Sequence, residues 1–334
     1  MTILAIHGGA GALPRSEMTL ERAAGFHEAL RHALEVGQTL LANGSRSLDA
    51  VEASVVALED CPLFNAGRGS SFNRDGKIEM EASVMDGSSK HAGSATLLKH
   101  VRNPVKLARR VMDQTAHVML AGADAEVFAR QQALALESEE YFFTQFRYEA
   151  MLKINVSDST ALSEDIVVPS YLNSHLMSST VGAVALDADN HLAAASSSGG
   201  TTNKYAGRIG QSCIVGSGIY ADDKTCAVSC TGFGEAFMRA VTAYDVAAQI
   251  EYKKLTLSQA AYAAIHDKLP GLGGLIAIDC SGAISMPFNT AGMYRAWIDK
   301  KGRIFTAIYD TCCAWTTSGK IISSATADPL SHCT

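Results

Sequence analysis

The hydroxyl side chains of Thr180 and Ser198 are the residue pair in the sequence best placed for chemistry. Residues 180–186 and 192–198 are predicted to be strands, and the turn between them is rich in Asp and Asn, which predicts an antiparallel hairpin. Paired residue numbers in such a hairpin have a constant sum, so the residues beside the turn fix every other pair. Thr180 and Ser198 are therefore expected to face each other at the open end. Taken alone, they also fit an ordinary cross-strand hydrogen-bonding pair.

Thr180 has a second potential role because of its place in the chain. It is the first residue of its predicted strand and follows residues 155–179, where Ser, Asp, Asn and Pro are scattered without a sustained period. Such a stretch predicts a flexible linker, and inside a compact chain it is usually functional or disordered. Cleavage before Thr180 would place a hydroxyl and a new α-amine on one residue. Because an α-amine has a pKa of about 7.7–8.0, it could act as the general base for that hydroxyl.

A glycine-rich turn at Cys230–Glu235 offers donors for developing negative charge. It joins a predicted strand to a predicted helix, and free N–H groups at a helix start suit a carboxylate or an oxyanion. The alternative is a tight connection that needs only small residues. A second turn, Gly216–Ala221, matches a dinucleotide-binding fingerprint, but the segment after it is predicted to be a strand. That context argues against a dinucleotide site.

The elements that must position these residues fall into two halves, on either side of the irregular stretch. Strands followed by helices predict an α+β layered sandwich rather than a βαβ alternation. The predicted strands are 2–7, 78–85 (half-buried), 180–186, 192–198, 213–217, 225–230, 273–279 and 303–309, and the predicted helices are 18–42, one N-capped by Ser47, 103–113, 234–249 and one that begins with a capping box at Thr256.

Composition excludes several classes of protein. The 334 residues are 47% hydrophobic and carry a net charge of −6, which disfavours a disordered chain and a nucleic-acid partner. No apolar run is long enough to predict a membrane span, and the first residues lack the features of a secretory signal, so a cytoplasmic location is expected. The eight cysteines form no CxxC pair and the histidines form no HExxH motif, which favours free thiols over disulfides or zinc.

Several motifs, in order along the chain, resemble the plant-type (type III) L-asparaginase and isoaspartyl peptidase family of N-terminal nucleophile hydrolases. The resemblance covers most of residues 1–297. The motifs that carry it are IHGGAG (Ile6–Gly11), LEDCPLFNAGRG (Leu58–Gly69), MDG (Met85–Gly87), TVGAVALD (Thr180–Asp187), NKYAGRIG (Asn203–Gly210), CTGFGE (Cys230–Glu235), GLGGLIAID (Gly271–Asp279) and PFNTAGMYRAW (Pro287–Trp297).

This resemblance implies one domain with a four-layer αββα sandwich, made as a precursor that cleaves itself between Ser179 and Thr180. Residues 1–179 would form the α subunit and residues 180–334 the β subunit, and two such pairs would associate as an (αβ)2 heterotetramer. The implied activity is hydrolysis of β-aspartyl dipeptides and L-asparagine. No cofactor is expected beyond a structural Na⁺ held by main-chain carbonyls of the loop Leu58–Arg68.

The resemblance also assigns roles to individual residues. Thr180 would be the nucleophile, Ser198 would stand where the family commonly has a supporting Thr, and Asn65 would lie near the nucleophile. Thr231 and Gly232 would form the oxyanion hole, while Arg208 would hold the substrate α-carboxylate, for which a guanidinium is the natural bidentate partner. The remaining substrate-binding residues would be Ile209, Gly210, Gln211, Phe233 and Gly234.

Two departures from the family pattern leave alternatives open. Gln211 stands where the family has an Asp that accepts the substrate ammonium, and Ser179 stands where a Gly is common. Gln211 keeps a related Thr hydrolase such as a glycosylasparaginase in consideration. Both departures would also fit an unprocessed, non-catalytic scaffold. The segment after Trp297 lies outside the resemblance.

Overall fold

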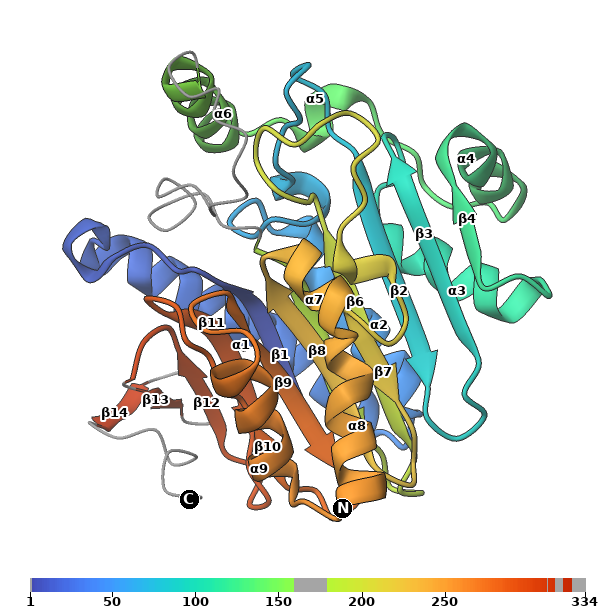
Figure 1. Ribbon diagram of the computed structural model, residues 1–334, viewed down its shortest axis with the longest axis vertical. Coiled ribbons are helices and arrows are strands. Elements are labelled where there is room, and N and C mark those ends of the chain that lie inside the picture. The colour runs from blue at the N-terminus through green and yellow to red at the C-terminus, as the bar shows by residue number, and fades with distance from the viewer. Residues whose placement is uncertain (1, 159–178, 311, 316–320, 326–334) are drawn as a thin grey trace.

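The computed structural model describes residues 2–158, 179–310, 312–315 and 321–325, which form two stacked β-sheets with helices packed against them (Figure 1). The large sheet has the strand order β14-β13-β12-β11-β1-β5-β6-β2-β3-β4, and the small sheet has the order β10-β9-β8-β7. The strands are β1 (Ile3–Ala10), β2 (Met80–Asp86), β3 (Ala92–Leu98), β4 (Met119–Ala121), β5 (Val181–Leu186), β6 (Leu192–Ser198), β7 (Ile219–Ala221), β8 (Cys226–Gly232), β9 (Gly273–Asp279), β10 (Ile284–Ser285), β11 (Met293–Ile298), β12 (Ile304–Ala307), β13 (Cys312–Trp315) and β14 (Ile321–Ala325).

Helices pack against both sheets. Helices α1 and α2 contact β1 and β5 of the large sheet, and α8 contacts β7 and β8 of the small sheet, in front of which it lies in Figure 1. The helices are α1 (Leu20–Ala42), α2 (Ser47–Asp60), α3 (Pro104–Gln114), α4 (Gly122–Gln131), α5 (Glu139–Phe142), α6 (Gln145–Asp158), α7 (Gly234–Ala240), α8 (Thr242–Lys253) and α9 (Leu257–Tyr262). No described helix has the length and apolar character that crossing a membrane would require.

Side chains alternate between the two faces of the central strands, and a hydrophobic cluster lies on each face of the large sheet. In β1, Leu4 and Ile6 pack in the cluster with α1 and α2, whereas Ile3 and Ala5 pack between the sheets against β9. The predicted β5–β6 hairpin register is confirmed, because Leu186 pairs with Leu192. Both strands are buried on both faces, as expected for the middle of a stacked sheet.

Several sequence predictions about the elements are wrong. The strand predicted as half-buried, β2, is buried along its whole length because β7 and α3 cover it. Residues 213–217 form a 3₁₀ turn and loop rather than a strand, and the long helix predicted from Gly234 breaks at Val241, whose backbone is left-handed. Ser47 begins α2 but does not cap it, because Arg46 is the N-cap.

The boundary of the predicted linker also changes. Helix α6 continues to Asp158, so residues 155–158 are helical rather than irregular. The greater part of the predicted linker, residues 159–178, lies outside the described residues. The capping box predicted at Thr256 is confirmed at the start of α9.

Candidate active site

Thr180 lies immediately before β5, in the space between the two sheets. Val184 and Leu186 of β5 point into the hydrophobic cluster between the two sheets. Because side chains alternate along a strand, Thr180 points in the same direction, toward the small sheet. Its side chain is fully buried. The Oγ1 atom lies 3.1 Å from Oγ of Ser212 and accepts a hydrogen bond of 3.2 Å from Nε2 of Gln211. The hydroxyl is therefore held in one place by neutral polar groups.

Thr231 of β8 connects the Thr180 backbone to β1. Its Oγ1 accepts hydrogen bonds from the N–H of Thr180 at 3.2 Å and from the N–H of Ala10 at 3.0 Å. Gly232 follows with φ +147°, and a Cβ there would collide with the carbonyl oxygen of Leu272. The structure thus brings Thr231 directly to Thr180, with Gly232 next in the strand.

Ser198 occupies the predicted register position, but its hydroxyl is engaged elsewhere. The Oγ atom of Ser198 accepts a hydrogen bond of 2.9 Å from the N–H of Gly200. The hydroxyl that contacts Thr180 is instead that of Ser212, in the 3₁₀ turn η4 (Gln211–Cys213). Ser212 could not be identified from the sequence, because nothing in its spacing relates it to the hairpin; only its position next to Gln211 pointed toward it.

Arg208 forms a two-pronged ion pair with Glu235 at the start of α7. The Nε–Oε1 and Nη2–Oε2 distances are 2.9 and 3.0 Å. Burial lowers the pKa of Arg208, but the hydrogen bond to Glu235 and nearby acidic groups outweigh it and raise the pKa overall. Its Nη1 atom is buried and has no hydrogen-bond partner among the described residues. One edge of the guanidinium is therefore available for a ligand.

Gln211 presents a second unused polar atom beside Arg208. Its Oε1 is buried and has no hydrogen-bond partner within the described part of the chain. A Cβ built on Gly234 would lie 2.5 Å from this Oε1 and 2.6 Å from Nη2 of Arg208. The absence of a side chain at Gly234 thus allows the side chains of Gln211 and Arg208 to pack closely against the start of α7, where they lie near each other.

A buried lysine and a buried carboxylate hold the start of the loop that carries these residues. The Glu79 carboxylate accepts the N–H of Gly207 at 3.1 and 3.3 Å. Nζ of Lys204 donates to the carbonyl oxygens of Glu79 at 2.6 Å and Gly199 at 3.0 Å. Burial lowers the pKa of Lys204, and the neighbouring acidic groups oppose this shift. None of these groups was singled out from the sequence.

Glu81 and Ser83, which point to the same face of β2, hold the end of this loop through hydrogen bonds. Oε2 of Glu81 accepts the N–H of Gly210 at 2.8 Å, and Oγ of Ser83 donates to the carbonyl oxygen of Ser212. Glu81 is 2% exposed, which is rare for a carboxylate, and its hydrogen bond to the loop that covers it explains the burial. Gln211 lies between the two anchored residues, Gly210 and Ser212. Strand β2 therefore fixes the position from which the Gln211 side chain reaches Thr180.

The other predicted site residues take supporting or peripheral positions. Asn65 donates from Nδ2 to the carbonyl oxygen of Gly200 at 2.7 Å and accepts the N–H of Ser71 at 2.8 Å, so both ends of its amide hold loops. Phe233 packs against the core beneath the small sheet. Ile209 is half-buried. Neither Asn65 nor Ser198 hydrogen-bonds to the Thr180 side chain.

His7 is a buried group near Thr180 that was not assigned a role from the sequence. Its Nε2 lies 2.8 Å from Oγ of Ser229 on β8. Complete burial lowers the pKa of His7 to about 3, and a contact with the Thr180 backbone opposes the shift only in part. The ring is therefore neutral at physiological pH and acts as a hydrogen-bonding strut beneath Thr180.

Ser179 packs tightly against Gly9, near the end of β1. A Cβ placed on Gly9, whose φ is +116°, would lie 2.5 Å from the Cβ of Ser179. The Oγ of Ser179 reaches the carbonyl oxygen of Ala10 at 3.4 Å. The residue before the predicted scissile bond is thus in close contact with the chain that also supports Thr231.

The loop Leu58–Arg68 brings main-chain oxygens close together. The carbonyl oxygens of Pro62 and Phe64 approach the place where Gly69 would carry a Cβ. These contacts leave no space for a side chain at position 69, and the Na⁺ expected in this loop stays a prediction. Glu59, at the end of α2, is buried in the same region.

Comparisons with known proteins place this chain among relatives. The asparaginase family matches residues 1–308. The chain belongs to the asparaginase family. It is 48% identical to an isoaspartyl peptidase of Escherichia coli (strain K12) over 298 residues, which is 88% of this chain and 92% of the relative. It is also 40% identical to a putative isoaspartyl peptidase/L-asparaginase of Dictyostelium discoideum, with 89% and 93% covered, and 38% identical to a probable isoaspartyl peptidase/L-asparaginase of Arabidopsis thaliana, with 92% and 98% covered.

The asparaginase-family match reaches further than the motifs alone suggested. It includes every predicted site residue and continues past Trp297 through β12. Strands β13 and β14 extend the large sheet beyond β12. The described part of the C-terminal segment beyond the match therefore forms the edge of the large sheet.

Proposed function

We propose that this chain is an isoaspartyl peptidase and L-asparaginase that matures by cleaving itself before Thr180. The observation that carries the proposal is the buried Thr180 hydroxyl, which contacts Ser212 and Gln211 while Thr231 holds the backbone N–H of the same residue. The names of the relatives support the same substrate class. Residues 1–179 become the α subunit and residues 180–334 the β subunit.

In the proposed mechanism, cleavage creates the base as well as the nucleophile. The freed α-amine of Thr180 takes the proton from its own hydroxyl, and Oγ1 attacks the β-carbonyl carbon of the substrate. Thr231 and Gly232 donate to the oxyanion, the amine or ammonia leaves, and water then releases aspartate from Oγ1. Arg208 Nη1 receives the substrate α-carboxylate, and Gln211 Oε1 receives the α-ammonium as a neutral acceptor.

We further propose that the stacked sheets and their helices form the four-layer αββα sandwich of the N-terminal nucleophile hydrolases. Contacts of α2 with β5, of β5 with β8 and of β8 with α8 support that order of layers. Two mature pairs associate as (αβ)2, which light scattering would report as a particle of about twice 35.3 kDa. The loop Leu58–Arg68 holds a Na⁺, so exchange of Na⁺ for a bulky organic cation should lower the melting temperature.

Denaturing electrophoresis with intact mass analysis tests the central proposal. The wild type is expected to give two chains of about 19 and 16 kDa, in proportion to residues 1–179 and 180–334, with Thr at the new N-terminus. Thr180→Ala should remain a single chain. A wild type that stays uncleaved after long incubation and hydrolyses neither asparagine nor β-aspartyl dipeptides would contradict the proposal and favour a non-catalytic scaffold.

A further inference from the structure

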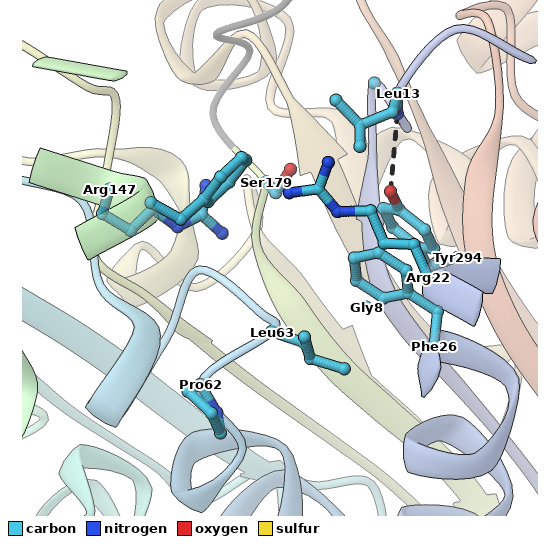
Figure 2. Close-up of a pocket in the computed structure, with 11 residues that line it drawn as sticks. Gly8, Leu13, Arg22, Phe26, Pro62, Leu63, Arg147, Ser179 and Tyr294 are labelled. Carbon is cyan, nitrogen blue, oxygen red and sulfur yellow. Dashed lines mark hydrogen bonds between the residues drawn. The ribbon is translucent and has the colours of Figure 1, made fainter. Parts of the chain in front are cut away.

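A pocket of about 130 Å³ opens beside Ser179, the residue immediately before the predicted scissile bond. Its walls are largely apolar, with Phe26, Leu63 and Tyr294 among the lining residues. Tyr294 is fixed by a hydrogen bond of 3.4 Å from the N–H of Leu13 to its hydroxyl, the dashed line in Figure 2. None of these residues takes part in the site around Arg208.

Two arginines bring positive charge into this apolar pocket. Figure 2 shows Arg22, from α1, and Arg147, from α6, approaching Ser179 from opposite sides. Both guanidinium groups lie near the ring of Phe146, at 4.9 and 5.5 Å from its centroid. Nε of Arg147 donates to the carbonyl oxygen of Gly69 at 2.9 Å, which orients the group.

No carboxylate of the described residues neutralises this pair, of which Arg22 is exposed and Arg147 is half-buried. Within the described ranges, neither Arg22 nor Arg147 has a carboxylate at ion-pairing distance, whereas Arg208 and Arg109 are both paired. Burial lowers the pKa of Arg147 to about 10, so holding its charge there is costly. A pocket with apolar walls and two unpaired guanidinium groups suits a carboxylate attached to an apolar group.

The place of the pocket determines which carboxylate that is. Gln211 contacts Thr180 Oγ1 and lies close to Arg208, and these two residues are proposed to receive the aspartyl part of a substrate. Ser179, which lines the pocket, is joined to Thr180 by the predicted scissile bond, so cleavage there would leave the pocket next to the freed Thr180. The leaving group of a β-aspartyl dipeptide is an amino acid, whose own α-carboxylate then lies beyond the scissile bond.

We propose that Arg22 and Arg147 form a leaving-group subsite, which binds the C-terminal carboxylate of β-aspartyl dipeptides whose second residue is apolar. This inference rests on the proposed function and adds a preference to it. The protein is expected to favour β-aspartyl-leucine over the same dipeptide with a C-terminal amide, because a neutral amide cannot form a charge-assisted contact with the two guanidinium groups.

Steady-state kinetics with three substrates test the subsite on the mature protein. The substrates are β-aspartyl-leucine, the same dipeptide with a C-terminal amide, and L-asparagine, which reports whether the remainder of the site is intact. The wild type should have a kcat/KM about tenfold or more higher for the acid than for the amide, since a charge-assisted contact is lost in the amide. Arg22→Ala should abolish this preference, and Arg22→Lys should retain part of it.

Arg15→Ala is the matched control, because Arg15 precedes the same helix but pairs with Asp310 and stacks over Tyr309 instead of lining the pocket. It should leave the acid-to-amide ratio unchanged. Equal kcat/KM for acid and amide in the wild type, or full preference retained in both Arg22→Ala and Arg147→Ala, would overturn the subsite while leaving the hydrolase intact. No hydrolysis of any of the three substrates would overturn the proposed function and the subsite with it.

Discussion

Neutral groups surround the Thr180 hydroxyl. Ser212 Oγ, Gln211 Nε2 and Thr231 Oγ1 make the hydrogen bonds at this residue, and His7 is kept neutral by burial. A hydroxyl in such surroundings is well oriented but has no side-chain base bonded to it. The α-amine that cleavage would create is therefore the base that this arrangement requires.

Replacement of Gln211 by Asp should strengthen substrate binding. Oε1 of Gln211 is neutral, and a carboxylate in its place would add charge assistance to the contact with an α-ammonium, about 1–2 kcal/mol. Gln211→Asp should therefore lower KM for asparagine roughly tenfold, measured by ammonia release. Gln211→Asn, which remains neutral, is the control for the change of length. A KM unchanged in the Asp variant would show that Gln211 does not meet the ammonium.

Replacement of Ser179 by Gly should accelerate maturation. The Cβ of Ser179 is packed against Gly9 in a space with no room for a second carbon, and removing it frees the backbone before the scissile bond. The fraction of uncleaved chain should fall faster with time in Ser179→Gly than in the wild type. Ser179→Ala keeps the Cβ and should mature at a rate close to that of the wild type. Identical time courses for all three proteins would exclude this crowding as a barrier.

Strand β2 acts as a template for the loop 207–212, which carries the proposed substrate-binding residues Arg208 and Gln211. Glu79, immediately before the strand, holds Gly207, and Glu81 and Ser83 hold Gly210 and Ser212 in the same order. The chain direction of β2 thus sets the spacing of the loop. Arg208 and Gln211 project from between these anchors.

Loss of the Glu81 anchor should affect substrate binding more than chemistry. Glu81→Ala leaves the buried N–H of Gly210 without an acceptor, at a cost of about 1–3 kcal/mol, and releases the loop between Arg208 and Gln211. KM should rise about tenfold or more, with a smaller change in kcat. Glu81→Gln retains an acceptor oxygen and should restore most of the binding. If Glu81→Ala lowers the melting temperature but leaves KM unchanged, Glu81 has only a structural role.

At the scale of the whole molecule, a buried carboxylate joins helices that cover the large sheet. Oε1 of Glu59, near the end of α2, accepts the N–H of Val105 in the first turn of α3 at 3.0 Å. Burial raises the pKa of Glu59 to about 8 from an ordinary value of 4.5. The folded protein therefore holds this proton more tightly than the unfolded chain does.

Stability should consequently fall as pH rises through the range set by Glu59. The contribution of the protonated carboxyl is fully present below about pH 4.5 and is lost as pH rises toward 8. Glu59→Gln cannot ionise and keeps the acceptor for Val105. Its melting temperature should exceed that of the wild type by at least about 2 °C at pH 8, and the gap should close near pH 5. A gap that does not depend on pH would contradict this assignment.

Local features of this protein could be predicted from the sequence. The β5–β6 register followed from one turn, the α9 capping box from its own residues, and the family from ordered motifs, because each depends on residues close together in the chain. The groups that meet Thr180, in contrast, are known only from the folded structure. Ser212, His7 and Glu81 reach the site through contacts between segments far apart in sequence, and such contacts leave no periodic signal. Burial of β2 on both faces and the break at Val241 were likewise decided by packing, which overrides local preference.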